Sequence, residues 1–138
     1  MSDSLRVIEG LTSIQSSFGP KETMNRLEAE IEAKGLSVFA RIDHAAGAAE
    51  VGLTLAPTEL IIFGNARGGT PLMQSVQTIG IDLPLKALVW QDASGKTWLS
   101  YNEPRWIAQR HGVAGAESTI DKIADLLSAI AREAAGSR

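Results

Sequence analysis

The chain has 138 residues, a length that suits one compact domain, and we expect a single domain over residues 1–138. Hydrophobic residues make up 44% of it and charged residues 21%, values typical of a globular protein whose core needs neither metals nor disulfides. It has no cysteine, which excludes disulfides, thiolate zinc sites and cysteine nucleophiles. Its formal net charge of −3 argues against a surface that binds nucleic acid.

The amino end, MSDSLRVIEG, lacks the basic start and the long apolar stretch of a secretory signal. No run of about 18 apolar residues occurs, so we expect no membrane-spanning helix. The longest apolar stretch, residues 60–63, has the length of a buried strand. These features predict a cytoplasmic protein without membrane contact.

The first part of the chain predicts a strand over residues 11–16 and then a helix over residues 20–34. Gly19 and Pro20 suit the cap and the first turn of that helix, and Gly35 suits its end. Apolar side chains recur in it at steps of three and four, which predicts one stripe that faces a core: Met24, Leu27 and Ile31.

Two strands are expected next, with a connecting segment between them. Residues 36–42 alternate between apolar and polar side chains, as a half-buried strand does. Residues 43–50 are rich in alanine but interrupted by Gly47, which predicts a connection containing a helical turn. Residues 58–64 include the continuous run LIIF, which is typical of a strand covered on both faces.

The second half begins with a break at residues 65–69, after which Thr70 and Pro71 predict the start of a short helix. Residues 85–91 and 97–101 predict a hairpin around the turn DASG, across which Trp90 and Trp98 are expected to pair. Two helices complete the chain in this interpretation, a short one over residues 104–111 and a long one over residues 118–135 capped by Ser118 or Thr119.

The resulting order is β-α-β-β-(α)-β-β-(α)-α. Because neighbouring strands are joined mostly by short links, we predict an α+β fold in which a mixed or antiparallel sheet of about five strands has helices packed on one face. No glycine fingerprint follows the first strand, so a doubly wound nucleotide fold is disfavoured and no cofactor is expected.

Several separated motifs resemble the bacterial domain-of-unknown-function family numbered 302: IIFGNARGGTPLM at residues 61–73, Asp43-His44, and IGIDLPLKALVW at residues 79–90. The resemblance covers residues 11–113, and the carboxyl-terminal helix at residues 118–135 fits the layout. It implies a small α+β domain with a curved sheet backed by helices, often seen as a homodimer. It implies no activity and no catalytic residue.

The glycine-rich loop at residues 64–71 is the leading candidate site, because it leaves a buried strand and enters a helix start. Backbone N–H groups and the positive end of a helix dipole meet at such a junction, and adjacent glycines let a bound group approach closely. We therefore expect a small molecule or anion to bind here, with five ligand-binding residues: Asn65, Arg67, Gly68, Gly69 and Thr70. The alternative is a tight connection capped by Thr70. The pattern is not a P-loop, since no Lys-Ser or Lys-Thr pair follows the glycines.

Asp43, His44 and His111 are weaker candidates for acid–base catalysis, because an imidazole beside a carboxylate can transfer a proton. A metal site would need both histidines to converge with Asp43 or Glu50. Because the chain has only two histidines and no thiols, we expect that it binds no metal ion. No G-x-S-x-G elbow occurs, so no serine triad is indicated.

Three interpretations of function remain open on these residues. The first is a homodimer that binds a small molecule or anion at the glycine loop. The second is an enzyme with a modest His/Asp acid–base site, so whether the chain is an enzyme is undecided. The third is a protein-interaction or assembly module without a ligand, which predicts an apolar, self-complementary patch.

Overall fold

The computed structural model describes residues 6–137, and its centre is an open five-stranded sheet in the order β1-β5-β4-β3-β2. Every neighbouring pair of strands is antiparallel. The predicted α+β class with an antiparallel sheet is therefore confirmed. The strands are β1 (Leu11–Gln15), β2 (Ser37–Asp43), β3 (Thr58–Gly64), β4 (Leu85–Gln91) and β5 (Thr97–Asn102).

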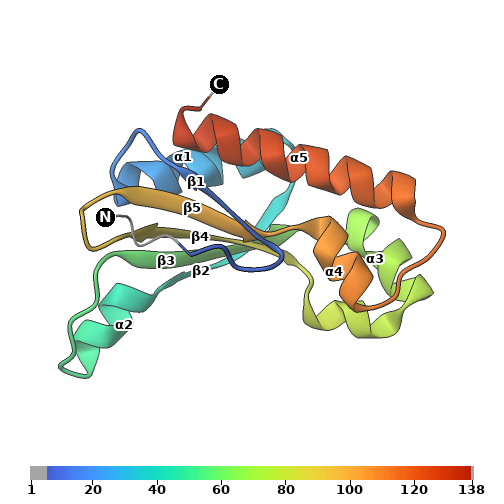
Figure 1. The fold of residues 1–138 in the computed structure, drawn as a ribbon, viewed down its shortest axis with the longest axis horizontal. Helices are drawn as coiled ribbons and strands as arrows, with labels where there is room; N and C mark the ends of the chain where they lie inside the picture. Colours follow the sequence, from blue (N-terminus) through green and yellow to red (C-terminus); the bar gives the residue numbers. More distant parts are fainter. Residues whose placement is uncertain (1–5, 138) are drawn as a thin grey trace.

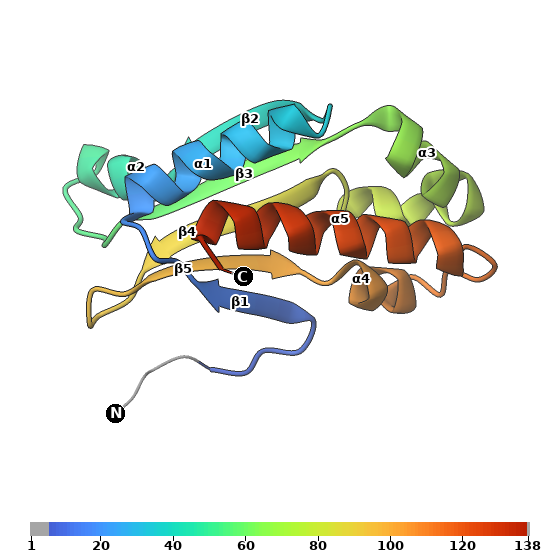
Figure 2. The same cartoon turned by 90° about the horizontal axis from the view of Figure 1, so that it is seen from above.

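Five α-helices and one 3₁₀ helix connect or flank these strands in the described part of the chain: α1 (Pro20–Ala33), α2 (His44–Glu50), α3 (Ala66–Ser75), η1 (Gln77–Ile81), α4 (Pro104–Arg110) and α5 (Glu117–Ala135). The long helices α1 and α5 lie side by side across one face of the sheet (Figures 1 and 2). The expected placement of helices on one face is thus confirmed for these two helices. Helix α2 instead projects on the opposite side of the sheet (Figure 1).

The main core lies between the sheet and the helices α1 and α5. The predicted stripe of α1 is fully buried there, and alternate residues of the central strands meet it because successive strand side chains point to opposite faces. Tyr101 keeps 6% of its surface exposed, whereas seven large side chains of this first cluster have no exposed surface: Met24, Leu27, Ile31, Ile61, Phe63, Leu99 and Ile130.

A second, smaller cluster lies where α3, η1 and α4 pack beside the amino-terminal half of α5. Its buried members are Leu72, Ile79, Ile107, Ala108 and Ile120. Short elements build this cluster, whereas long regular elements build the first. The two clusters meet along α5, and that junction positions the candidate site.

The face of the sheet turned away from α1 and α5 is also apolar. On β3 and β4 the residues that alternate with the core positions are half-buried: Leu60, Ile62, Leu88 and Trp90. No helix among residues 6–137 packs over the middle of this face (Figure 1). The expectation that β3 is covered on both faces is therefore wrong within the described chain, because α1 and α5 supply only one layer.

Most predicted boundaries agree with the structure to within a residue or two. The connection at residues 43–50 is a complete short helix, α2, capped by the Asp43 side chain, which accepts a hydrogen bond from Ala46 N–H. Helix α5 begins at Glu117 after Ala116 without a side-chain cap, so the predicted caps Ser118 and Thr119 are wrong. The predicted Trp90–Trp98 pair is confirmed, with ring centroids 6.2 Å apart.

Candidate functional site

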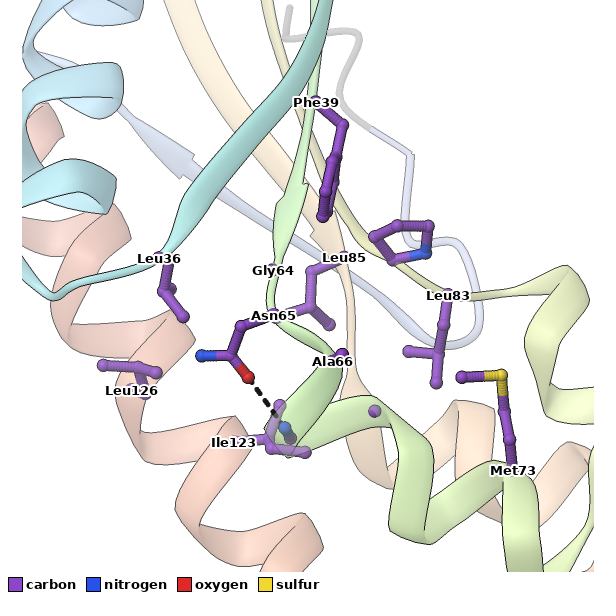
Figure 3. Close-up of a pocket in the computed structure, with 13 residues that line it drawn as sticks. Leu36, Phe39, Gly64, Asn65, Ala66, Met73, Leu83, Leu85, Ile123 and Leu126 are labelled. Carbon is purple, nitrogen blue, oxygen red and sulfur yellow. Dashed lines mark hydrogen bonds between the residues drawn. The ribbon is translucent and has the colours of Figure 1, made fainter.

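A cavity of about 270 Å³ opens beside the glycine-rich loop, at the junction of the two hydrophobic clusters. The loop forms one wall through its backbone and the Asn65 side chain (Figure 3). The other walls come from the start of β2, the segment before β4, α3 and α5. The large side chains that line the cavity are apolar: Leu36, Phe39, Met73, Leu83, Leu85, Ile123 and Leu126.

A bulge in β2 contributes to the mouth of this cavity. The register between β2 and β3 shifts between Val38 and Ala40, so Phe39 is left without a partner in the ladder. A bulge kinks its strand and re-aims a side chain. Phe39 accordingly keeps 57% of its surface exposed while it lines the cavity.

The helix after the loop begins at Ala66, a full turn before the predicted start at Thr70. Its cap is Asn65, whose Oδ1 accepts a hydrogen bond of 2.7 Å from Gly68 N–H. Asparagine is among the best N-cap residues, and this bond satisfies one of the four unpaired donors at a helix start. The prediction of Thr70 as the cap is therefore wrong, and Pro71 lies inside the helix instead of opening it.

The early start of α3 changes what the glycines do. Gly69 N–H donates to the Asn65 backbone carbonyl, and Gly68 N–H is already used by the cap. Neither amide is left for an anion. Gly69 instead supplies space, because a Cβ built there would lie 3.6 Å from Leu83 and 3.7 Å from Met73, in ordinary contact at the cavity wall.

Three of the five predicted ligand-binding residues line the cavity: Asn65, Gly68 and Gly69. The other two, Arg67 and Thr70, are exposed and lie outside its lining. The amide nitrogen of Asn65 points toward Leu36 and Leu126 (Figure 3). The cavity therefore combines apolar walls with one polar donor, an arrangement suited to an apolar molecule more than to a small anion.

Asp43 and His44 lie at the far end of the sheet from this cavity. The Asp43 carboxylate caps α2 and borders a second, open cavity of about 300 Å³ together with Lys21 and Glu59. His44 is exposed and lies outside the lining of both cavities. The adjacency of these two residues in the sequence thus does not place them in one pocket.

His111 takes part in a polar cluster that sequence reasoning missed. Its Nε2 lies 2.6 Å from Asp82 Oδ2 and its Nδ1 lies 3.0 Å from Thr78 Oγ1, while Arg110 holds the same carboxylate at 2.8 Å. Burial of Asp82 opposes its charged form, but the hydrogen bond from His111 and the charge of Arg110 outweigh burial and lower the pKa of Asp82. The cluster ties the segment after η1 to the end of α4. No motif spacing signals it, because its members come from elements that only the fold brings together.

The acid–base interpretation needs its candidates Asp43, His44 and His111 to line one pocket with the glycine-rich loop. The structure places α2 and α4 at opposite ends of the molecule in both views (Figures 1 and 2), and none of the three residues lines the cavity beside the glycine-rich loop. Among residues 6–137 no group of three or more histidine, aspartate or glutamate side chains is placed to hold a metal ion. Among the predicted site residues, Asn65, Gly68 and Gly69 are the ones that line the cavity beside residues 64–71.

Comparison with known proteins gives a family match and two kinds of similar protein. The family described as "Domain of unknown function DUF302" matches residues 12–130. The crystal structure of an uncharacterized conserved protein DUF302 from Bacillus stearothermophilus superposes with a TM-score of 0.82 over 92% of this chain and 99% of that one, at 20% identity. At that identity the likeness shows the fold alone.

Proteins called fluoride-specific ion channel FluC 1 also share sequence with this chain. The one from Brucella suis biovar 1 is 54% identical over 104 residues, which are 75% of this chain and 41% of that protein. The one from Brucella abortus biovar 1 is 54% identical over 104 residues and 38% of its length. The chain thus spans about two-fifths of these relatives. None of the helices in residues 6–137 has the length and apolar character to cross a bilayer. The cytoplasmic location stays a prediction.

Proposed function

The chain belongs to the DUF302 family, and we propose that it binds a small, mostly apolar molecule in the cavity beside residues 64–71 and works as a homodimer. The observation that carries the proposal is the chemistry of the cavity walls. Seven large apolar side chains surround a space of about 270 Å³, and Asn65 stands at its edge as a hydrogen-bond donor. Dry cavities of roughly 150 Å³ already bind benzene, so this volume is ample for a small ring or a short chain.

The position of the cavity supports the proposal further. Leu36, Leu85 and Leu126 adjoin the first hydrophobic cluster, whereas Met73, Leu83 and Ile123 adjoin the second. A molecule bound between them would contact both clusters and bury apolar surface on each side. Burial of apolar surface is worth roughly 25 cal/mol per Å², so binding raises the stability of the folded state.

The test is a thermal-melt titration with benzene and with 1-hexanol, repeated with phosphate and acetate as anion probes. We expect the two apolar probes to raise Tm and the anions to have no effect. Gly69→Leu places a side chain in the cavity and is expected to abolish the rise, whereas Gly69→Ala is expected to weaken it. Gly47→Leu and Gly47→Ala are the matched controls, because no atom lies within 4 Å of a Cβ at Gly47 in the exposed helix α2.

Two outcomes would count against the cavity. If neither apolar probe raises Tm, or if Gly69→Leu leaves the rise intact, the space beside the loop is not a binding site. If acetate or phosphate raises Tm and Arg67→Ala removes that effect, the loop binds anions through Arg67, as its sequence alone suggested.

A second candidate function is that of a module acting with a membrane channel. It rests on the relatives, in which a region 54% identical to this chain makes up about two-fifths of proteins called fluoride-specific ion channels. Under this interpretation the chain contacts the channel part of such a protein. The remainder of the Brucella suis relative, reconstituted in liposomes, should then bind the purified chain and change its rate of fluoride efflux. Efflux and binding identical with and without the chain would exclude this role.

A further inference from the structure

An arm formed by residues 44–57, which are α2 and the segment that returns to β3, exposes a row of apolar side chains. Val51, Leu53 and Leu55 keep 72%, 66% and 46% of their surface exposed. The arm leaves the sheet where β2 ends and β3 begins, and it projects on the side away from α1 and α5 (Figure 1). Large exposed apolar patches on a soluble domain mark contact surfaces.

The uncovered face of the sheet lies on the same side as the arm. It consists of the positions that alternate with the core on the strands: Ile42, Leu60, Ile62, Lys86, Leu88, Trp90 and Trp98. Facing pairs across the ladder join these positions into one surface, for example Ile42 opposite Leu60 and Leu60 opposite Leu88. The arm and this face together form an L-shaped apolar surface.

The charges on the two parts of this surface are complementary. Lys86 is the cation of the uncovered face, and Glu50 is the anion at the end of α2 in the arm. Within residues 6–137 neither side chain takes part in an ion pair. One chain therefore carries two surfaces of complementary charge: an apolar sheet face with a cation, and an apolar projection with an anion.

We propose that two copies of the chain pack face to face about a two-fold axis, so that the arm of each crosses the uncovered sheet face of the other. This inference rests on the homodimer in the proposed function and assigns its interface. A two-fold contact uses the same surface on both copies, which the L shape permits because each copy offers one arm and one face. The occupant of the surface is thus a second copy of this chain.

The places of Glu50 and Lys86 select the axis, because an axis along the strands would also bring the uncovered faces together but would leave the partner's arm at the Thr58–Trp90 end. Rotation about an axis that runs parallel to the sheet and across its strands makes the two uncovered faces meet. It also sets the strands of the second copy in the opposite direction to those of the first. The arm leaves its own sheet beside the pair Thr58–Trp90, whereas Lys86 pairs with Ile62 toward the other end of β4. The reversal brings the partner's arm to the Lys86 end, where the partner's Glu50 meets Lys86.

The test measures the monomer–dimer equilibrium by sedimentation and by size-exclusion chromatography with light scattering. The wild-type chain is expected to be a dimer at micromolar concentration. Leu53→Asp in the arm and Leu88→Asp on the face are each expected to give monomers, because a charge in an apolar interface must be desolvated without a partner. Ile81→Asp is the matched control: Ile81 is 73% exposed, lies on η1 outside both surfaces, and its variant is expected to remain dimeric.

Charge reversal tests the axis. Glu50→Lys and Lys86→Glu should each raise the dimer Kd roughly tenfold, because each change sets like charges opposite one another at two symmetric places. The double variant should return the Kd to near the wild-type value. Circular dichroism checks that each variant is folded, and the exposed Glu50 and Leu53 positions keep the test independent of core packing.

A monomeric wild-type chain would overturn the homodimer and this interface together, and would leave the apolar face for a different partner. A dimer that persists in Leu53→Asp and Leu88→Asp would overturn this interface while the homodimer stands. Failure of the double charge variant to restore the Kd would overturn the face-to-face axis. None of these outcomes bears on the cavity, which the benzene titration tests separately.

Discussion

The two hydrophobic clusters differ in how they are built, and the difference explains where the cavity lies. In the first cluster a sheet packs against two long helices, and all of its buried residues except Tyr101 keep 1% or less of their surface exposed. In the second cluster the short elements α3, η1 and α4 meet the start of α5, and its buried residues keep between 1% and 7% of their surface exposed. Long regular elements fill their interface continuously, whereas short ones joined by turns leave space at their edges. The cavity beside residues 64–71 is that space.

The largest expected effect comes from removing leucine side chains in the two clusters. Leu27→Ala in the first cluster should lower the free energy of unfolding by about 3–5 kcal/mol, because close-packed neighbours cannot collapse into the space left behind. Leu72→Ala in the second cluster should cost less, about 2–3 kcal/mol, because its neighbour Met73 borders the cavity and can relax. Urea unfolding measured by circular dichroism checks both. Equal costs would show that the two clusters are packed alike.

The next effect concerns the polar cluster of Asp82, Arg110 and His111, which ties the segment after η1 to the end of α4. Asp82→Asn should lower the free energy of unfolding at pH 7 by about 1–3 kcal/mol, because His111 and Arg110 lose a half-buried charged partner. Asp121→Asn is the control, because it breaks an exposed ion pair with Arg105. It should change the free energy of unfolding by less than about 1 kcal/mol.

The pH dependence of the same carboxylate has a definite sign. Burial raises the pKa of Asp82, but the hydrogen bond from His111 and the charge of Arg110 lower it by more. The pKa of Asp82 in the folded chain therefore lies below its ordinary value of 3.8. The unfolded chain then binds the proton more readily than the folded one. The contribution of Asp82 to stability is therefore complete above about pH 4 and is lost as the pH falls through its lowered pKa. Acid titration of stability should be flatter in this range for Asp82→Asn than for the wild type, and parallel curves would contradict the assignment.

The smallest expected effect compares the two side-chain helix caps. Asn65→Ala removes the cap of α3 beside the cavity and should lower the free energy of unfolding by about 1 kcal/mol. Asp43→Ala removes the cap of the exposed helix α2 and should affect global stability less, because α2 has no buried residue. Hydrogen exchange of Gly68 N–H and Ala46 N–H reports each cap directly. A larger global loss for Asp43→Ala would mean that α2 is held by contacts beyond its own chain.

Elements with strong local signals could be predicted from the sequence. Helix α1 has a proline at its first turn, a glycine after its end and an apolar stripe between them, and its predicted and observed ends differ by one residue. The hairpin of β4 and β5 has equally clear local signals, because two β-prone runs flank the turn DASG. Local stereochemistry and periodicity determine such elements.

The start of α3 shows where local signals compete. Thr70 and Pro71 form a good helix start, but Asn65 forms a better one once Gly68 N–H can reach its side chain. The glycines disfavour a helix by about 1 kcal/mol each, and contact of α3 with Leu83 and Ile79 compensates for that cost. The signal was present at Asn65, yet its weight depended on packing that the sequence does not display.

By itself the sequence determined most of the secondary structure, the α+β class and the stretch of chain beside which the candidate site lies, because backbone preference and hydrophobic periodicity act over a few residues. Only the tertiary structure decided that this site is an apolar cavity and not an anion cradle, that His111 faces Asp82 and not His44, and that one face of the sheet lacks a helical cover among residues 6–137. Each of these depends on which side chains from distant segments meet, and such contacts are set by the packing of the whole chain.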